Sequence, residues 1–168
     1  MIQPIDGRTL DEAEIFLAKQ QEIEILYVFD ERGTQVLKIQ GDYETVSVPI
    51  SHTHLLKNAC VTHNHPQGSS FSIQDIQRAV DYDVKEMRVV TSACIFVVTR
   101  KEKGWDIDFR DENTLNWLEE CKTLARDKLD KEISQNIISL YDAHNFFDSF
   151  VWSIFFFNFG YAYKKINL

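Results

Sequence analysis

The sequence predicts an α/β core over residues 1–108, followed by an α-helical extension over residues 109–168. In the first segment, short runs rich in β-branched and aromatic residues alternate with turn signals and short helical patterns. From Asp111 onwards the apolar residues recur at helical spacing, beginning with Leu115 and Leu118. A length of 168 residues is enough for one ordinary domain with such an appendage.

The elements can be placed in order from local signals. A helix is predicted over 9–21, because Thr9 is a typical N-cap and acidic residues follow it in the first turn. Hydrophobic alternation predicts strands at 22–30 and 34–41, joined by the turn "ERG". The other predicted elements are a strand or edge at 44–50, a short helix at 51–58 capped by Ser51, a buried strand at 59–65, a helix at 72–82, a two-strand unit at 86–106, one long helix or two shorter ones at 112–140, and a helix at 141–159.

Charge and cysteine content restrict the function classes. The chain has 18 basic and 26 acidic residues, a formal charge of −8, and no window that collects the Lys/Arg stripe of a phosphate-backbone binder. Nucleic acid is therefore not an expected main partner. Three cysteines at irregular spacing, Cys60, Cys94 and Cys121, indicate buried free thiols in a reducing cytosol. With no apolar signal segment visible in "MIQPIDGRTLDEAEIF", a cytoplasmic protein is expected.

The segment 146–163, "FFDSFVWSIFFFNFGYAY", is dense in aromatic residues and about as long as a membrane span. Asp148 and Asn158 interrupt it, which favours a helix buried against the core or a partner over a membrane helix. An aromatic stripe has a spacing close to that of a helix and comprises Phe147, Phe150, Ile154, Phe157 and Tyr161. So many aromatic residues favour a protein–protein contact or homo-oligomerisation through this tail.

The stretch "VTHNHPQGSSFSIQDI", residues 61–76, contains a candidate metal site. Because alternate residues of a strand point the same way, His63 and His65 would present two imidazoles on one side of the strand end. Asp75 would lie in the first turn of the next helix, where its carboxylate can reach back over the strand. Two histidines and one carboxylate, with a fourth position left to water, describe a catalytic zinc site.

Such a site needs a general base to accept a proton from the water. Glu22 and Glu24 lie on the preceding strand, on the face that also carries Leu26. A carboxylate facing the core requires a partner, and partial desolvation would raise its pKa towards useful base strength. Ser72 could donate its hydroxyl to a developing oxyanion.

Together these residues resemble the JAMM (MPN+, JAB-domain) metalloprotease motif: an early Glu, then His-x-His-Pro, then Ser-x-x-Asp. "HNHPQG" resembles the RadC-like branch. The wider stretch from "ILYVFDERG" to "GWD" is similar to the JAB-like module at the C-terminus of phage head-morphogenesis proteins and of some polymorphic toxins. The resemblance covers roughly residues 22–106.

The resemblance implies a mixed β-sheet flanked by helices and a zinc peptidase or isopeptidase, of which many cut ubiquitin-like conjugates. It assigns one zinc ion to His63, His65 and Asp75, the general base to an N-terminal Glu, and transition-state stabilisation to Ser72. Two details depart from the family pattern or stay open. Six residues separate His65 from Ser72, where the family has seven. Counting back from the strand end, Glu24 fits the phage-type register and Glu22 the RadC-type register; we choose Glu24 and keep Glu22 as the alternative.

Simpler interpretations stand beside these. Ser72-Ile-Gln-Asp75 is also a capping-box pattern that requires no metal. The second His-x-His pair, His52 and His54 in "SHTH", has no Gly loop or Ser-x-x-Asp after it and is not expected to bind metal. Cys60 should point to the side of the strand opposite His63. The competing function is a non-catalytic MPN-like interaction module.

Overall fold

A computed structural model describes all 168 residues and contains a mixed six-stranded sheet flanked by helices. The strand order is β2-β1-β3-β4-β5-β6; β3 and β4 are parallel, and every other neighbouring pair is antiparallel. The elements are α1 (Leu10–Leu17), β1 (Ile25–Phe29), β2 (Gln35–Gln40), a 3₁₀ helix η1 (Ile50–Leu55), β3 (Cys60–Asn64), α2 (Ile73–Asp81), β4 (Glu86–Val90), β5 (Cys94–Thr99), α3 (Glu112–Ser134), α4 (Leu140–Phe159) and β6 (Ala162–Asn167). The predicted α/β fold class is confirmed.

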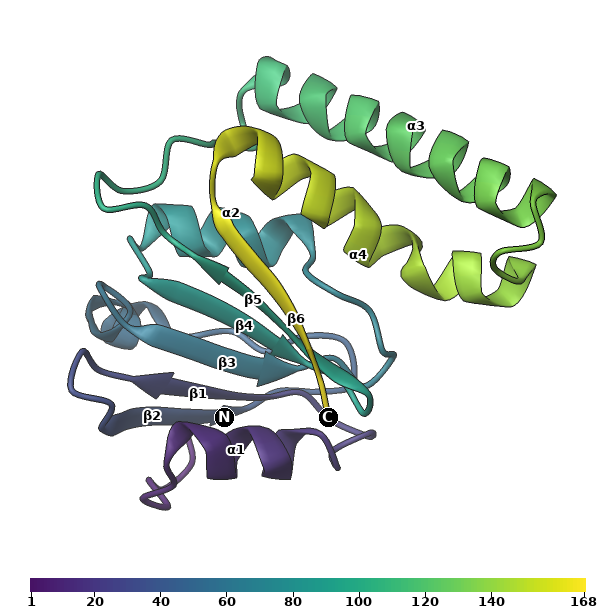
Figure 1. Cartoon of the computed structure of the whole chain (residues 1–168). Helices are drawn as coiled ribbons and strands as arrows, with labels where there is room; N and C mark the ends of the chain where they lie inside the picture. The colour runs from purple at the N-terminus through teal and green to yellow at the C-terminus, as the bar shows by residue number, and fades with distance from the viewer.

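The helices cover the two faces of the sheet unequally (Figure 1). Helix α1 lies on one face, where Ala13 and Leu17 pack against Tyr27 and Phe29 of β1. Helices α2 and α4 lie on the other face, and α3 packs on the outer side of α4. Residues from both the predicted core and the predicted extension share the larger apolar cluster, including Val89 of β4 and Phe156 of α4.

Residues 44–50 do not form the predicted strand. Asp42 accepts hydrogen bonds through its carboxylate from the N–H groups of Glu44 and Thr45, which makes a turn directly after β2. A Cβ at Gly41 would lie 2.0 Å from the Thr45 carbonyl oxygen, so this close approach requires glycine. The chain then runs as a loop, with Val46 buried in the core. The "VSV" alternation predicted a strand, but this turn prevents the segment from pairing along β2.

The short helix after this loop also differs from the prediction. It is a 3₁₀ helix over Ile50–Leu55, and its N-cap is Pro49. The predicted cap, Ser51, makes no capping hydrogen bond; its hydroxyl lies 2.9 Å from Nδ1 of His52. Pro49 has no N–H and a restricted φ, which suits it to the start of a helical turn.

The C-terminal segment contains a strand as well as helices. Helix α4 ends at Gly160, whose φ of 72° is the left-handed conformation typical of a helix C-cap. Tyr161, predicted as part of the helical aromatic stripe, therefore lies beyond the end of the helix. The chain then forms β6, which pairs antiparallel with β5. The helical prediction for 112–159 is confirmed as two helices, α3 and α4. No helix is long and apolar enough to cross a membrane.

Candidate metal centre

The two histidines of the motif lie at the C-terminal end of β3. His63 is the fourth residue of the strand and His65 follows its last residue. β1 pairs antiparallel with β3, and Leu26 lies opposite His63. The same register carried two residues further brings Glu24 opposite His65. The central position of β3 in the sheet therefore places both imidazoles beside the start of β1.

Helix α2 brings the carboxylate to the histidines. Asp75 is the third residue of α2, and Ser72 caps the helix with both hydrogen bonds of a capping box. The Nε2 atoms of His63 and His65 are 3.0 Å apart. Asp75 Oδ1 is 3.3 Å from Nε2 of His63, and Asp75 Oδ2 is 3.5 Å from Nε2 of His65. Two nitrogens and a carboxylate thus face one point.

These distances fit a tetrahedral metal ion. Zinc bound at about 2.0–2.1 Å places neighbouring ligand atoms of a tetrahedron about 3.3 Å apart. The two imidazole Nε2 atoms are 3.0 Å apart and Nε2 of His63 is 3.3 Å from Oδ1 of Asp75, both close to this value, and one ligand atom from each of the three residues lies within 4.8 Å of the others. His63, His65 and Asp75 are the one group of metal-ligating side chains in the chain that converges in this way. The residues present could therefore hold a metal ion with one coordination position left open.

Hydrogen bonds orient two of the three ligands. Nδ1 of His65 lies 3.2 Å from the Ser69 carbonyl oxygen, so Nδ1 carries the hydrogen and Nε2 keeps its lone pair for a metal. The Ser72 N–H and hydroxyl both donate to Oδ2 of Asp75, each at 2.7 Å, which leaves Oδ1 available. His63 is almost fully buried and its Nδ1 has no hydrogen-bond partner, so packing and the contacts of its Nε2 with His65 and Asp75 orient this ring.

The charges of the three groups depend on one another. Burial and the neighbouring His63 lower the pKa of His65 to about 4, so His65 is neutral near pH 7. Burial opposes protonation of His63 as well, but the adjacent Asp75 carboxylate raises the pKa of His63 above its ordinary value. Burial would raise the pKa of Asp75, and the histidines instead hold it far below the usual range. In the metal-free protein the Asp75 carboxylate therefore favours the protonated form of His63, and a bound cation would take over this favourable interaction with Asp75.

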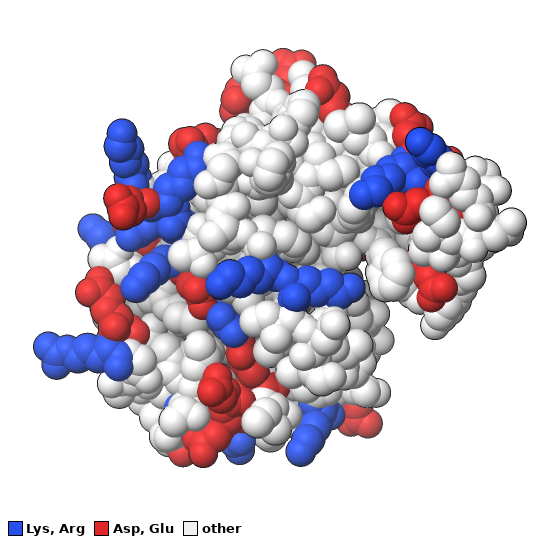
Figure 2. Space-filling view, viewed as in Figure 1, with Lys and Arg blue, Asp and Glu red and all other residues white.

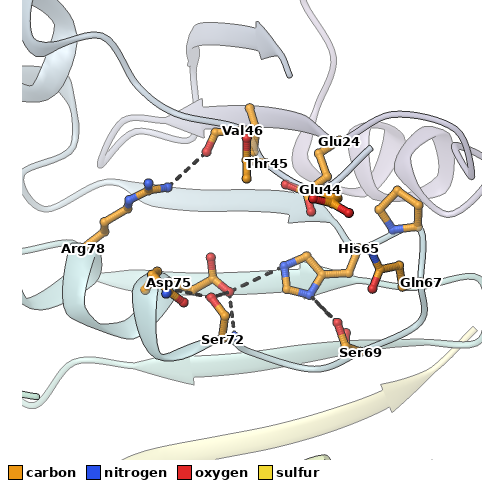
Figure 3. Close-up of a pocket in the computed structure, with 12 residues that line it drawn as sticks. Glu24, Glu44, Thr45, Val46, His65, Gln67, Ser69, Ser72, Asp75 and Arg78 are labelled. Atoms are coloured by element: carbon orange, nitrogen blue, oxygen red, sulfur yellow. Dashed lines mark hydrogen bonds and ion pairs between the residues drawn. The ribbon is translucent and has the colours of Figure 1, made fainter. Parts of the chain in front are cut away.

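Glu24 lines a polar cavity of about 390 Å³ together with His65 and Asp75 (Figure 3). The side chain of Glu24 is buried, and burial raises its pKa to about 7, with His63 opposing the rise and Asp75 adding to it. Glu44, from the loop after β2, lies next to Glu24 on the same side of the cavity, and Arg78 of α2 lies at the opposite end. A carboxyl group with a pKa near 7 can both accept and release a proton at neutral pH.

Two positioning residues were not recognised in the sequence. Asn64 accepts a hydrogen bond from the Ile25 N–H at 2.7 Å, and its amide donates to the carbonyl oxygens of Gln20 and Ile23 at 2.9 Å. Asn64 therefore anchors the chain on both sides of Glu24. Arg78 donates to the Val46 carbonyl oxygen at 3.1 Å and so ties the loop after β2 to helix α2. For Asn64 the available signal was its position between the two candidate ligands His63 and His65. For Arg78 no local sequence pattern indicates the contact with the Val46 carbonyl oxygen.

The structure shows which of the other candidate residues lie near the three ligands. Glu22 is exposed and does not line the cavity, whereas Glu24 does. Cys60 packs on the α1 face of the sheet, opposite His63, as the strand geometry predicts. The six-residue spacer allows Ser72 to complete the capping box. In this arrangement the Ser72 hydroxyl donates to Asp75, so its role towards an oxyanion stays a prediction.

Comparison with known proteins gives no relative. No protein-family model, no curated protein and no solved structure matches the chain. The function must therefore be argued from the site itself.

Proposed function

We propose that the protein is a zinc-dependent hydrolase that cleaves a peptide or isopeptide bond, with the JAMM-type arrangement that its motif resembles. The observation that carries the proposal is the convergence of two imidazole nitrogens and one carboxylate beside a buried Glu24 whose pKa is about 7. A closed structural zinc site would have four protein ligands, whereas three ligands next to a solvent-filled cavity are typical of catalytic sites.

The residues of the site would divide the proposed reaction into metal binding, proton transfer and positioning. His63, His65 and Asp75 would hold the ion, which supplies Lewis acidity towards a water molecule and a substrate carbonyl. Glu24 would accept the proton of the attacking water and deliver it to the leaving amine, for which a pKa near 7 is well suited. Ser72 keeps Asp75 oriented and lines the cavity, and we propose that its hydroxyl would also donate to the developing oxyanion of a bound substrate.

The cavity supports a polar or extended substrate over an apolar one. Nearly all the residues that line it are polar or charged, and two carboxylates, Glu24 and Glu44, face Arg78 across it. The segment between β2 and β3 contains only a loop and the short η1, which leaves little structure to hold a large folded partner. A flexible peptide or a small conjugate is therefore the substrate class to test first.

The test compares zinc-loaded protein with two glutamate variants on a mixed fluorogenic peptide library and on a lysine-linked isopeptide probe. Glu24→Gln should lower kcat/KM by about 10²–10⁴-fold while zinc content is retained. Glu22→Gln is the matched control, since it makes the same change two residues away on an exposed side chain, and it should keep full activity. Turnover that survives in Glu24→Gln would overturn the base assignment. Stoichiometric zinc with no hydrolysis of any probe would instead favour a metal-stabilised binding module.

A further inference from the structure

The two edge strands of the sheet, β2 and β6, differ in whether another segment of the chain pairs with their outer side. The N-terminal segment pairs with the outer side of β2: the Gln40 N–H donates to the Met1 carbonyl oxygen and the Gln3 N–H to the Lys38 carbonyl oxygen, both at 2.9 Å. β2 is thereby covered. No segment pairs with the outer side of β6 at the opposite end of the strand order. In Figure 1, β6 runs along the front of the molecule with its outer side free.

The backbone groups available on this edge can be identified. The Leu168 N–H donates to the Ala93 carbonyl oxygen, so Leu168 and the residues two and four positions before it direct their backbone groups towards β5. Tyr163, Lys165 and Asn167 therefore direct their N–H and C=O groups outwards. An exposed row of this kind is a template for one more strand.

A groove lies on the α4 side of the same edge. It has a volume of about 500 Å³ and is lined mainly by Phe150, Ile154, Phe157, Tyr161 and Tyr163, with Lys128 at its border. The side chain of Phe157 is 82% exposed. Exposure of such a large aromatic side chain to water is unfavourable, and an exposed apolar patch of this kind is typical of an interaction site. The Tyr163 hydroxyl donates to the Ser149 carbonyl oxygen at 3.2 Å, which fixes β6 against α4. A strand added to β6 would place alternate side chains over this groove.

The charge at this edge is opposite to that of the whole chain. The formal charge of the protein is −8, yet Lys164 and Lys165 are adjacent and exposed on β6, and Lys128 borders the groove. Figure 2 shows basic side chains crossing the face where β6 lies, beside a largely uncharged surface. The lysines of this chain that form ion pairs are others, namely Lys38, Lys101 and Lys122. Lys165 and Lys128 lie over the aromatic rings of Phe146 and Phe150 instead.

A second copy of the chain does not suit this edge. In a two-fold antiparallel pairing of β6 with itself, the outward residues must face one another. The two registers that pair the most residues of β6 place either Lys164 or Lys165 opposite its own copy, and like charges directly opposite are destabilising. The register centred on Ile166 pairs only residues 164–168. The lysines therefore disfavour self-association and favour an acidic strand.

We propose that the outer edge of β6 and the adjoining groove bind an extended, acidic segment of a partner protein as an additional strand. Its acidic side chains would lie on the face of the sheet to which Lys164 points, and its apolar side chains on the opposite face would enter the groove beside Phe157, where Lys165 and Lys128 extend over aromatic rings. This surface is separate from the metal centre, since β6 lies three strands away from β3, whose C-terminal end carries the two histidines. The proposal therefore stands independently of the proposed hydrolase activity.

The experiment uses a fluorescein-labelled peptide of about seven residues in which glutamates alternate with phenylalanine and valine, and a counterpart with lysine at each acidic position. The acidic peptide should bind the full chain with a Kd of ~10–100 µM in low salt, at least about tenfold tighter than the basic one. Lys164→Glu/Lys165→Glu should weaken acidic binding by at least about tenfold and reverse the preference. Lys19→Glu/Lys57→Glu makes the same charge change on exposed residues elsewhere and should leave the preference unchanged.

Amide hydrogen exchange followed by NMR supplies the structural readout. On addition of the acidic peptide, the outward amides of Tyr163, Lys165 and Asn167 should become protected, while those of Lys164 and Ile166 are protected already in the free protein. The metal-free His63→Ala/His65→Ala variant should bind the peptide equally well, which separates this surface from the metal centre. Absence of binding, or binding that leaves the outward amides unprotected, would overturn the proposal. Protection without peptide together with a dimeric mass in solution would replace it with self-association.

Discussion

The chain contains two His-x-His pairs, and only one of them converges with a carboxylate into a group that could hold a metal ion. His63 and His65 lie at the end of β3, and their Nε2 atoms are 3.0 Å apart. His52 and His54 lie on the 3₁₀ helix η1, and neither belongs to a group of converging ligands. Residues two apart share one side of a strand but point in different directions on a helix with about three residues per turn. The backbone conformation, and not the spacing, decides which pair can chelate.

The neighbouring serines repeat the contrast. Ser72 caps α2 and so fixes the helix that delivers Asp75 to the first pair. Ser51 precedes the second pair, but its hydroxyl lies against Nδ1 of His52 and caps nothing. The second pair therefore has no serine-capped helix that brings a carboxylate to it, and it belongs to no converging group of ligands.

The largest effect is expected from removing the imidazoles of His63 and His65. His63→Ala/His65→Ala should lower bound zinc from about one ion per chain to near zero, because two of the three ligands are lost. His52→Ala/His54→Ala should keep the zinc content of the wild type. Plasma mass spectrometry on untagged, dialysed protein measures both, with circular dichroism to confirm folding. Zinc retained by the first variant, or lost from the second, would show that the ion is bound elsewhere.

Asp75→Asn should lower zinc affinity by about 100-fold or more, since it removes the only anionic ligand while leaving the shape of the side chain unchanged. The matched control is Asp81→Asn at the other end of α2, where the carboxylate pairs with the exposed Arg110. Competition with a chromogenic chelator measures the affinity of both variants. Equal affinities in the two would indicate that Asp75 serves only as a helix-capping residue.

Glu24→Gln should stabilise the metal-free protein at alkaline pH. The folded-state pKa of Glu24 is raised to about 7 from an ordinary 4.5, so between these pH values the folded protein holds a proton that the unfolded chain has released. The contribution of Glu24 to stability is therefore fully present below pH 4.5 and is lost as pH rises through 7. We expect the free energy of unfolding of Glu24→Gln to exceed that of wild type by roughly 1–3 kcal/mol at pH 8 and by little at pH 5.

Urea unfolding in the presence of EDTA at the two pH values measures this difference. Glu22→Gln is the control, because its exposed side chain should change the free energy of unfolding equally at both. A Glu24→Gln difference that is the same at pH 5 and pH 8 would contradict the buried, protonated state of Glu24.

The metal centre was predictable because its parts are local. One strand end supplies both histidines, and a capping box of four residues fixes Asp75 relative to Ser72. The position of Glu24 beside them needed one further step, the pairing of β1 with β3. The choice between Glu24 and Glu22 could not be made from alternation alone, because both residues belong to the same face of an extended chain. What distinguishes them is tertiary: Glu24 is covered by the loop after β2, and Glu22 is exposed.

The misplaced elements depended on contacts that local patterns do not contain. β6 consists largely of exposed residues and has little hydrophobic alternation, and its partner β5 lies more than sixty residues earlier in the chain. Residues 44–50 have the alternation of a strand, but the turn at Asp42 and the close approach at Gly41 direct them into a loop over the site. In both cases long-range packing outweighed local propensity.

The smallest effect is expected at the two serines. Ser72→Ala should lower the free energy of unfolding by about 1 kcal/mol, the usual cost of losing an N-cap, because the Asp75 N–H loses its acceptor at 3.1 Å. Ser51→Ala should stay within about 0.5 kcal/mol of wild type, since no capping hydrogen bond is removed.

Ser72→Ala should also weaken zinc binding by about tenfold, because Oδ2 of Asp75 loses one of the donors that orient the carboxylate. Urea unfolding with EDTA and chelator competition measure the two quantities separately. A loss of stability without a loss of zinc affinity would mean that the cap holds α2 but does not position the ligand, and the contrast between the two serines would then concern folding alone.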